Sequence, residues 1–160
     1  MPEVIYTIGH GNISFMKFVS LIQANNITQI IDIRSIPYSR KAPWSNKSRL
    51  SQLLKPLGIR YTYLGHKFSE KAQTFQHPGQ SPKQNSAQVY LDAVSTVIQA
   101  AAKRKIALLC AEGDPAHCIR QNVIAQTLLS REIEVHHILQ NGSLIEAWQE
   151  PTNPKQPELF

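Results

Sequence analysis

Five short runs of apolar, mostly β-branched residues alternate along the chain with segments whose apolar residues recur at helical spacing. The runs are residues 4–8, 27–33, 59–64, 106–110 and 133–139. Strands that alternate with helices form parallel βαβ units with right-handed crossovers. The alternation therefore predicts an α/β fold: a single three-layer domain with a mostly parallel, Rossmann-like sheet of about five strands and helices on both faces. We expect the strand order 3-2-1-4-5.

Several local signals set the expected boundaries. Ser14 is a good N-cap for a first helix, and Asp114-Pro115 is typical of a helix start. Leu144–Trp148 is expected to form a final helical turn. The polar residues 66–85 show no period and have the length of a lid loop, and residues 151–160 carry three prolines and are expected to be a tail. The predicted domain is therefore residues 1–150.

Composition excludes several classes of protein. Hydrophobic residues make up 42% of the 160, which argues against disorder. No apolar run approaches the roughly 20 residues that span a bilayer, and the N-terminus lacks the pattern of a signal peptide. Two cysteines are too few for a disulfide scaffold and indicate a cytoplasmic location, without contact to a membrane.

The positive charge is concentrated in one segment. Residues 34–60 carry seven basic and no acidic side chains, whereas the whole chain has a net charge of +6. Such a segment attracts a phosphate-bearing small molecule or a nucleic acid, although a solvated basic surface is an equal alternative. Aromatic residues interleave with the charges, and the candidate nucleic-acid contacts are Tyr38, Lys41, Trp44, Lys47 and Arg49.

Ligands of open parallel sheets bind beyond the carboxyl ends of the strands, near the point where the strand order reverses. Polar residues follow four of the five predicted strands. The candidate anion-binding residues are Asp32, Arg34, Arg40 and Arg120. An ion pair of purely structural importance between Asp32 and Arg34 is the alternative. His10 and Glu112 are the candidate acid–base residues, with a structural histidine and a surface carboxylate as their alternatives.

The segment from Cys110 to Arg120 adds a candidate nucleophile. Cys118 is expected in the first turn of a helix, where the helix dipole and Arg120 would favour its thiolate. Cys110 ends a buried strand and is expected to act as a small apolar residue. The spacing of the two cysteines is not a usual zinc pattern, so no metal site is predicted. His136 and His137 point to opposite faces of a strand and are expected to be structural.

Short motifs occur in a fixed order over most of the chain. They are YTIGH at 6–10, DIRSIP at 32–37 with Ser39-Arg40, GIRY at 58–61, LCAE at 109–112, Asp114-Pro115 and Cys118–Arg120. Together they resemble the DUF488 family, a domain of unknown function found in small α/β proteins. The resemblance implies a site that contains His10, Asp32, Arg34, Arg40, Cys110, Glu112, Cys118 and Arg120.

The chain departs from the family pattern at Gly11, His66 and Ile119. The family usually has a histidine at position 119, so its loss argues against a Cys–His pair and leaves an inactive or binding-only member as an alternative. The preferred hypothesis is a hydrolase or transferase with an anion site for a phosphate, nucleotide or nucleic acid. The alternative is a non-catalytic nucleic-acid-binding module that uses the basic segment 34–60, and a third is a partner-binding protein. The sequence identifies no cofactor.

Overall fold

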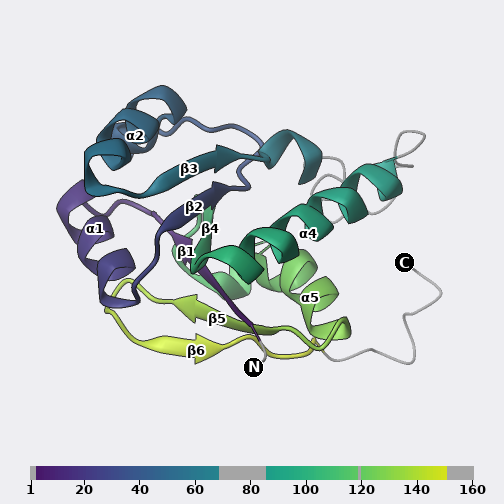
Figure 1. Ribbon diagram of the computed structural model, residues 1–160. Coiled ribbons are helices and arrows are strands. Elements are labelled where there is room, and N and C mark those ends of the chain that lie inside the picture. Colours follow the sequence, from purple (N-terminus) through teal and green to yellow (C-terminus); the bar gives the residue numbers. More distant parts are fainter. Residues whose placement is uncertain (1–2, 69–85, 119, 151–160) are drawn as a thin grey trace.

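The computed structural model describes residues 3–68, 86–118 and 120–150 (Figure 1). Six strands form one sheet in the order β3-β2-β4-β1-β5-β6. The strands are β1 (Val4–Gly9), β2 (Gln29–Asp32), β3 (Arg60–Tyr63), β4 (Ile106–Cys110), β5 (Glu134–Ile138) and β6 (Leu144–Glu146). The first five are parallel and β6 is antiparallel to β5. The α/β class and the mostly parallel, Rossmann-like sheet are confirmed.

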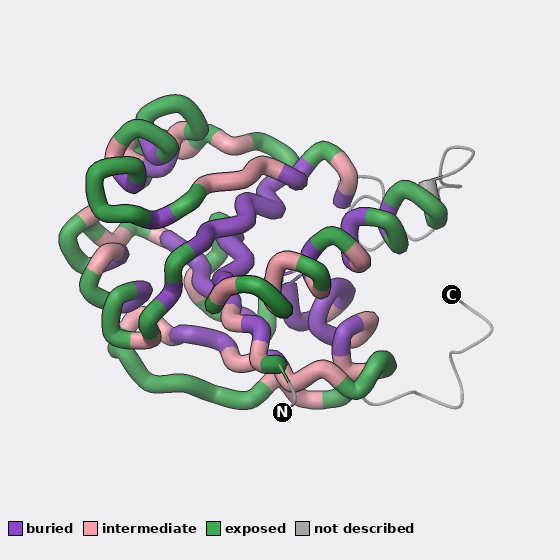
Figure 2. Tube along the Cα trace, viewed as in Figure 1, coloured by how far each residue is buried: buried purple, intermediate pink, exposed green. Residues whose placement is uncertain are grey.

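Helices cover both faces of the sheet and make a three-layer molecule (Figures 1 and 2). They are α1 (Phe15–Ala24), α2 (Lys47–Leu54), α4 (Ser86–Lys103) and α5 (Gln126–Ser130). Ser14 caps α1 as predicted, because its side chain accepts the Lys17 N–H at 3.1 Å. Phe18 of α1 and Leu54 of α2 belong to the apolar cluster on one face, whereas Val94 of α4 and Leu128 of α5 belong to that on the other. In the described part of the chain, no helix is long and apolar enough to cross a membrane.

The predicted strand order 3-2-1-4-5 is wrong, because β4 lies between β2 and β1. All five residues of β4 are buried. A strand that is apolar on both faces is most stable in the interior of a sheet. There helices cover both faces, and a neighbouring strand on each side pairs its backbone hydrogen-bonding groups. The new order puts β1 and β4 side by side, with chain connections that leave in opposite directions toward β2 and β5.

The predicted helical turn at Leu144–Trp148 is also wrong, because Leu144–Glu146 forms the edge strand β6. A tight turn returns the chain from β5, with Gly142 at φ +93° and the Leu139 N–H bonded to the Ser143 carbonyl at 2.9 Å. Only a residue without a side chain adopts that backbone conformation at little cost.

The helix expected to run on from Asp114-Pro115 is interrupted. Asp114 does cap a helical start, but only the single 3₁₀ turn η3 (Pro115–His117) follows. Cys118 is extended, at φ −131° and ψ 148°, and the chain becomes helical again in the π-helix η4 (Arg120–Ala125), which continues into α5. Cys118 therefore precedes the longer helix instead of lying inside its first turn. The expected lid lies outside the described residues from 69 onward, as do the expected tail and Ile119.

Candidate functional site

An open pocket of about 830 Å³ lies at the carboxyl ends of β1 and β4. The chain leaves these two strands toward opposite sides of the sheet, so the pocket sits at the topological switch point, where α/β proteins bind ligands. Four loops contribute its walls. The lining residues are His10, Gly11, Asn12, Ser39, Lys41, Ala111, Glu112, Gly113, Asp114 and Gln140.

Glycines allow the loops around the pocket to approach one another. A Cβ on Gly9 would lie 1.7 Å from the carbonyl oxygen of Glu112, so the end of β1 touches the backbone of the loop after β4. Gly11 has φ +49°, and a Cβ there would lie 2.2 Å from the amide nitrogen of Gln140. A Cβ on Gly113 would lie 2.5 Å from the same nitrogen. Gln140 therefore fills the space that two glycines leave open.

His10 lies beneath the pocket and is only 2% exposed. Its Nε2 lies 3.3 Å from Arg34 Nη1, which can only donate, so Nε2 accepts. The proton is then on Nδ1, which donates to the Gly11 carbonyl at 2.8 Å. Burial lowers the pKa of His10, and the neighbouring Arg34 adds to that effect. His10 is a neutral imidazole with both nitrogens engaged.

Arg34 is held by a two-pronged ion pair with Asp32, and both side chains are buried. Nη2 and Nε donate to the two carboxylate oxygens at 2.7 and 2.9 Å, and the remaining N–H groups reach Ser45 and His10. The Tyr61 hydroxyl donates to Asp32 at 2.5 Å, and burial together with this bond raises the pKa of Tyr61. All five guanidinium hydrogens of Arg34 are thus committed to protein acceptors. This arrangement is the structural ion pair that the sequence left open.

Arg120 is fully buried on the other face of the sheet. Its Nη1 donates to the Thr7 hydroxyl at 3.1 Å, and Nη2 donates to the carbonyls of Glu112 and Gly113 at 3.3 and 2.8 Å. Its Nε has no hydrogen-bond partner, and no carboxylate of the described residues pairs with it. Arg120 therefore positions the loop that lines the pocket while it carries a buried positive charge.

The Thr7 hydroxyl continues this network into the core. It lies 2.6 Å from His137 Nδ1, and His137 Nε2 lies 2.8 Å from Gln121 Oε1. Because the Gln121 amide nitrogen donates to the Trp148 carbonyl, Oε1 is the acceptor and the His137 proton is on Nε2. Burial lowers the pKa of His137 to about 4, and Arg120 adds to the effect. His137 is neutral and structural, as predicted.

Cys118 lies just before the helix that begins at Arg120. Its carbonyl accepts the N–H groups of Gln121 and Asn122 at 3.2 and 3.1 Å, and its sulfur accepts the Arg120 N–H at 3.5 Å. The residue is 8% exposed. A hydrogen bond from the Cys110 thiol lowers the pKa of Cys118 to about 7, and the Arg120 N–H and charge add to this. Burial raises the pKa of Cys110.

Charged groups on the pocket wall are of both signs. Lys41 is the cation among the lining residues, and Glu112 and Asp114 are exposed carboxylates. One oxygen of Glu112 accepts the Asp114 N–H at 3.0 Å, which fixes its side chain at the rim. Glu112 and Arg34 follow adjacent parallel strands and lie at the same end of the sheet.

The other predicted residues lie outside the pocket lining. Arg40, Lys47 and Arg49 are exposed, and Lys47 lies 4.7 Å from the centre of the Tyr63 ring. Tyr38 is 59% exposed. The Trp44 ring instead packs on His10, Phe15 and Phe18, and its Nε1 donates to the Ile13 carbonyl at 3.0 Å.

Sequence reasoning missed three polar residues of the pocket. Asn12, Ser39 and Gln140 offer hydrogen-bonding side chains, and none of them was a candidate. Gln140 could have been found, since it follows the fifth strand and therefore belongs to the same rim.

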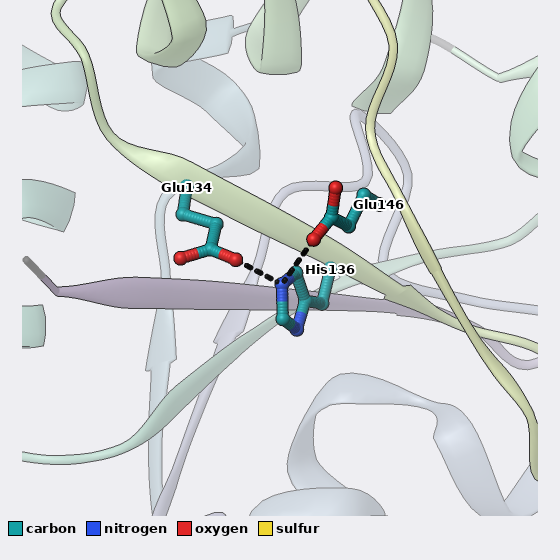
Figure 3. A group of neighbouring side chains, drawn as sticks. All are labelled: Glu134, His136 and Glu146. Carbon is teal, nitrogen blue, oxygen red and sulfur yellow. Dashed lines mark hydrogen bonds and ion pairs between the residues drawn. The ribbon is translucent and has the colours of Figure 1, made fainter.

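One group of side chains in the described part of the chain could hold a metal ion. Glu134, His136 and Glu146 present ligand atoms within 4.8 Å of one another on β5 and β6 (Figure 3). His136 Nε2 lies 2.7 Å from Glu134 and 3.9 Å from Glu146. A hydrogen bond within β5 and a contact across to Glu146 on β6 account for this cluster, which is partly exposed and separate from the pocket.

Comparisons with known proteins give one match. No curated protein and no solved structure matches the chain. The model of the family described as domain of unknown function DUF488 matches residues 14–128. That match covers more than two thirds of the chain, and the protein belongs to the DUF488 family.

Proposed function

We propose that the pocket at the carboxyl ends of β1 and β4 binds a small ligand that carries a phosphate or a similar anionic group. The observation that carries this proposal is the position of Lys41 on the wall of a pocket at the switch point. Around Lys41, Asn12 and Gln140 offer amide donors and Ser39 offers a hydroxyl. This donor set suits phosphate oxygens.

Arg34 and Arg120 act beneath the pocket in this proposal. Asp32 neutralises Arg34, whereas the charge of Arg120 has no carboxylate partner in the described residues. Arg120 also holds the Glu112 and Gly113 carbonyls. The arginines therefore shape the site, and Lys41 meets the ligand directly.

Glu112 is the proposed proton acceptor if the bound ligand reacts. It is exposed on the pocket wall and held by the Asp114 N–H. A carboxylate at this place would take a proton from an attacking water or hydroxyl group, as a hydrolase or transferase requires. His10 is less suited to that role because both of its ring nitrogens are engaged and it is buried.

Binding of inorganic phosphate and of nucleoside monophosphates, measured by isothermal titration calorimetry, tests the proposal. Lys41→Ala should weaken binding about 10-fold or more, because it removes a charge-assisted contact of about 1.5–3 kcal/mol. Lys47→Ala is the matched control, since Lys47 has the same charge in the same segment but lies outside the lining. Equal affinities of the two variants would contradict the proposal. Glu112→Gln should retain binding and abolish turnover of any ester that the wild type hydrolyses.

A second candidate function is nucleic-acid binding without catalysis. The observation in its favour is that Tyr38 and the cations Arg40, Lys47 and Arg49 are all exposed. An exposed ring among cations suits base stacking and phosphate contacts. Trp44 contributes less to this function, because its ring packs on α1.

A further inference from the structure

Two cysteines and a buried arginine lie together on the face of the sheet that α4 and α5 cover. Cys110 ends β4, Cys118 precedes the helix that leads into α5, and Arg120 is the first residue of that helix. Both cysteines are free and buried, and the residues are 3% and 8% exposed. Both cysteines belong to one buried cluster, and the neighbouring Cys110 thiol and the charge of Arg120 lower the pKa of Cys118. We propose that Cys118 is the anionic partner of Arg120 and that, with Cys110, it forms a redox-active pair that small hydroperoxides oxidise to a disulfide.

The charge of Arg120 is the first argument. A fully buried guanidinium without a counter-ion is costly, and a buried cation is normally paired. The groups that accept its hydrogen bonds are a hydroxyl and two carbonyls, all of them neutral. Asp32 is bound to Arg34 on the opposite face, and the Glu112 carboxylate is exposed. Of the described ionisable groups around Arg120, His137 is neutral, so only the thiols can supply a negative charge.

The backbone identifies which thiol ionises. Cys118 lies just before the helix from Arg120 to Ser130, and its sulfur accepts the Arg120 N–H at 3.5 Å. An N–H donor and the positive end of a helix both stabilise a thiolate. Cys110 lies instead in a fully buried strand, where burial raises the pKa of its thiol. The pair therefore presents a thiolate beside a thiol that donates to it.

The chemistry of the pair follows from this asymmetry. The Cys118 thiolate attacks the terminal oxygen of a hydroperoxide, an S–O bond forms and the O–O bond breaks. The leaving alkoxide or hydroxide takes a proton and departs as alcohol or water. Cys110 then loses its proton and attacks the oxidised sulfur, so that a disulfide forms and a second water leaves. Two thiols are oxidised and one peroxide is reduced.

Burial restricts the oxidant to small molecules. Because the whole Cys118 residue is only 8% exposed, hydrogen peroxide can reach its sulfur, whereas a protein disulfide or glutathione cannot. The lost thiolate would also leave Arg120 without its anion, and Arg120 holds two carbonyls of the pocket wall. This inference does not depend on the proposed ligand, because its test uses no ligand.

Alkylation of the wild-type protein by iodoacetamide gives the first test. The rate at Cys118, followed by peptide mass spectrometry from pH 5 to 10, should reach half of its high-pH plateau near pH 7. An ordinary thiol with a pKa of 9.0 would give about 1% of the plateau at that pH. Comparison with the plateau of the same site removes the effect of burial on the rate. A midpoint near 9 would overturn the proposal.

Treatment with hydrogen peroxide gives the second test. The intact mass of the wild type should fall by the mass of two hydrogens, and its cysteines should become resistant to alkylation. Dithiothreitol should reverse both changes. Cys110→Ser should instead stop at a sulfenic acid on Cys118 that dimedone traps, and Cys118→Ser should leave Cys110 unmodified. Arg120→Lys retains the charge and should keep the alkylation midpoint closer to 7 than Arg120→Met does. Oxidation of the wild type directly to sulfinic acid, without a disulfide, would overturn the pairing.

Discussion

Arg34 and Arg120 lie beneath the same pocket but on opposite faces of the sheet. Arg34 follows Asp32, which shares its face with the apolar residues that α1 and α2 cover, whereas Arg120 bonds to Thr7 on the face beneath α4 and α5. The sheet separates the two guanidinium groups, so they do not clamp one anion between them. Arg34 has a carboxylate partner and Arg120 has a sulfur nearby, and this difference gives the two residues different roles.

Removal of the Arg34 charge should destabilise the protein strongly. Arg34→Met leaves the Asp32 carboxylate buried without its ion pair, and breaking a buried pair in this way costs about 3–5 kcal/mol. The free energy of unfolding in urea measures the loss. Arg40→Met is the control, because Arg40 is exposed and its replacement should cost no more than about 0.5 kcal/mol. Equal stabilities of the two variants would show that the Arg34 network does not support the fold.

His137 should make the protein sensitive to acid. Its pKa is about 4 in the folded protein against 6.5 when unfolded, so between these values only the unfolded chain binds the proton. Stability is therefore complete above pH 6.5 and falls as the pH decreases toward 4, by about 3 kcal/mol in total.

Unfolding in urea at several pH values tests this effect. His137→Gln retains a hydrogen-bonding side chain that does not titrate, and it should reduce the pH dependence between 6.5 and 4, leaving the part that the buried His10 contributes. His136→Gln, on the opposite face of the same strand, is the control and should leave that dependence in place. An unchanged slope in His137→Gln would assign the acid sensitivity to another group.

Local sequence patterns predicted most elements of the fold but not their order. The cap at Ser14 and the fully apolar run at 106–110 each have a local cause, and both appear where expected. The position of β4 between β2 and β1 depends instead on which strands pair with its two edges. No local sequence pattern encodes that choice. The edge strand at 144–146 is short and exposed, so it lacks the apolar alternation that identifies a strand.

The site could be predicted only in part. The rule that ligands bind at strand ends named His10 and Glu112, and charge clustering named Lys41 as a nucleic-acid contact; all three line the pocket. Gln140 was overlooked although the rule covers it, because no charged or nucleophilic residue marks the end of the fifth strand. The position of Cys118 before the helix from Arg120 was not predicted either. Asp114-Pro115 is a stronger sequence signal for a helix start than a cysteine whose sulfur accepts a backbone N–H.

Two glycines at the pocket should differ sharply when each is replaced by alanine. In Gly9→Ala the new Cβ would lie 1.7 Å from the Glu112 backbone oxygen, so the two loops must move apart, at the upper end of the 1–3 kcal/mol typical of overpacking. In Gly113→Ala the Cβ meets the end of the flexible Gln140 side chain at 2.5 Å, which can turn away at a cost below about 1 kcal/mol. Thermal unfolding should separate the two variants clearly. A Gly9→Ala protein as stable as the wild type would show that β1 and the β4 loop are not in contact.

The nucleic-acid alternative makes its own prediction about salt. Lys47 and Arg49 are exposed on α2, outside the pocket lining, so their charge reversal should leave phosphate binding in the pocket unchanged. If the basic segment binds single-stranded nucleic acid, Lys47→Glu with Arg49→Glu should abolish binding to a fluorescent oligonucleotide.

The wild-type affinity should then fall steeply with salt, with a slope of about −0.7 per phosphate contact in a plot of log affinity against log salt concentration. Tyr38→Ala should weaken binding by about 1–3 kcal/mol through loss of stacking, with little change in that slope. Binding that ignores the double reversal but fails in Lys41→Ala would assign the ligand to the pocket instead of the basic surface.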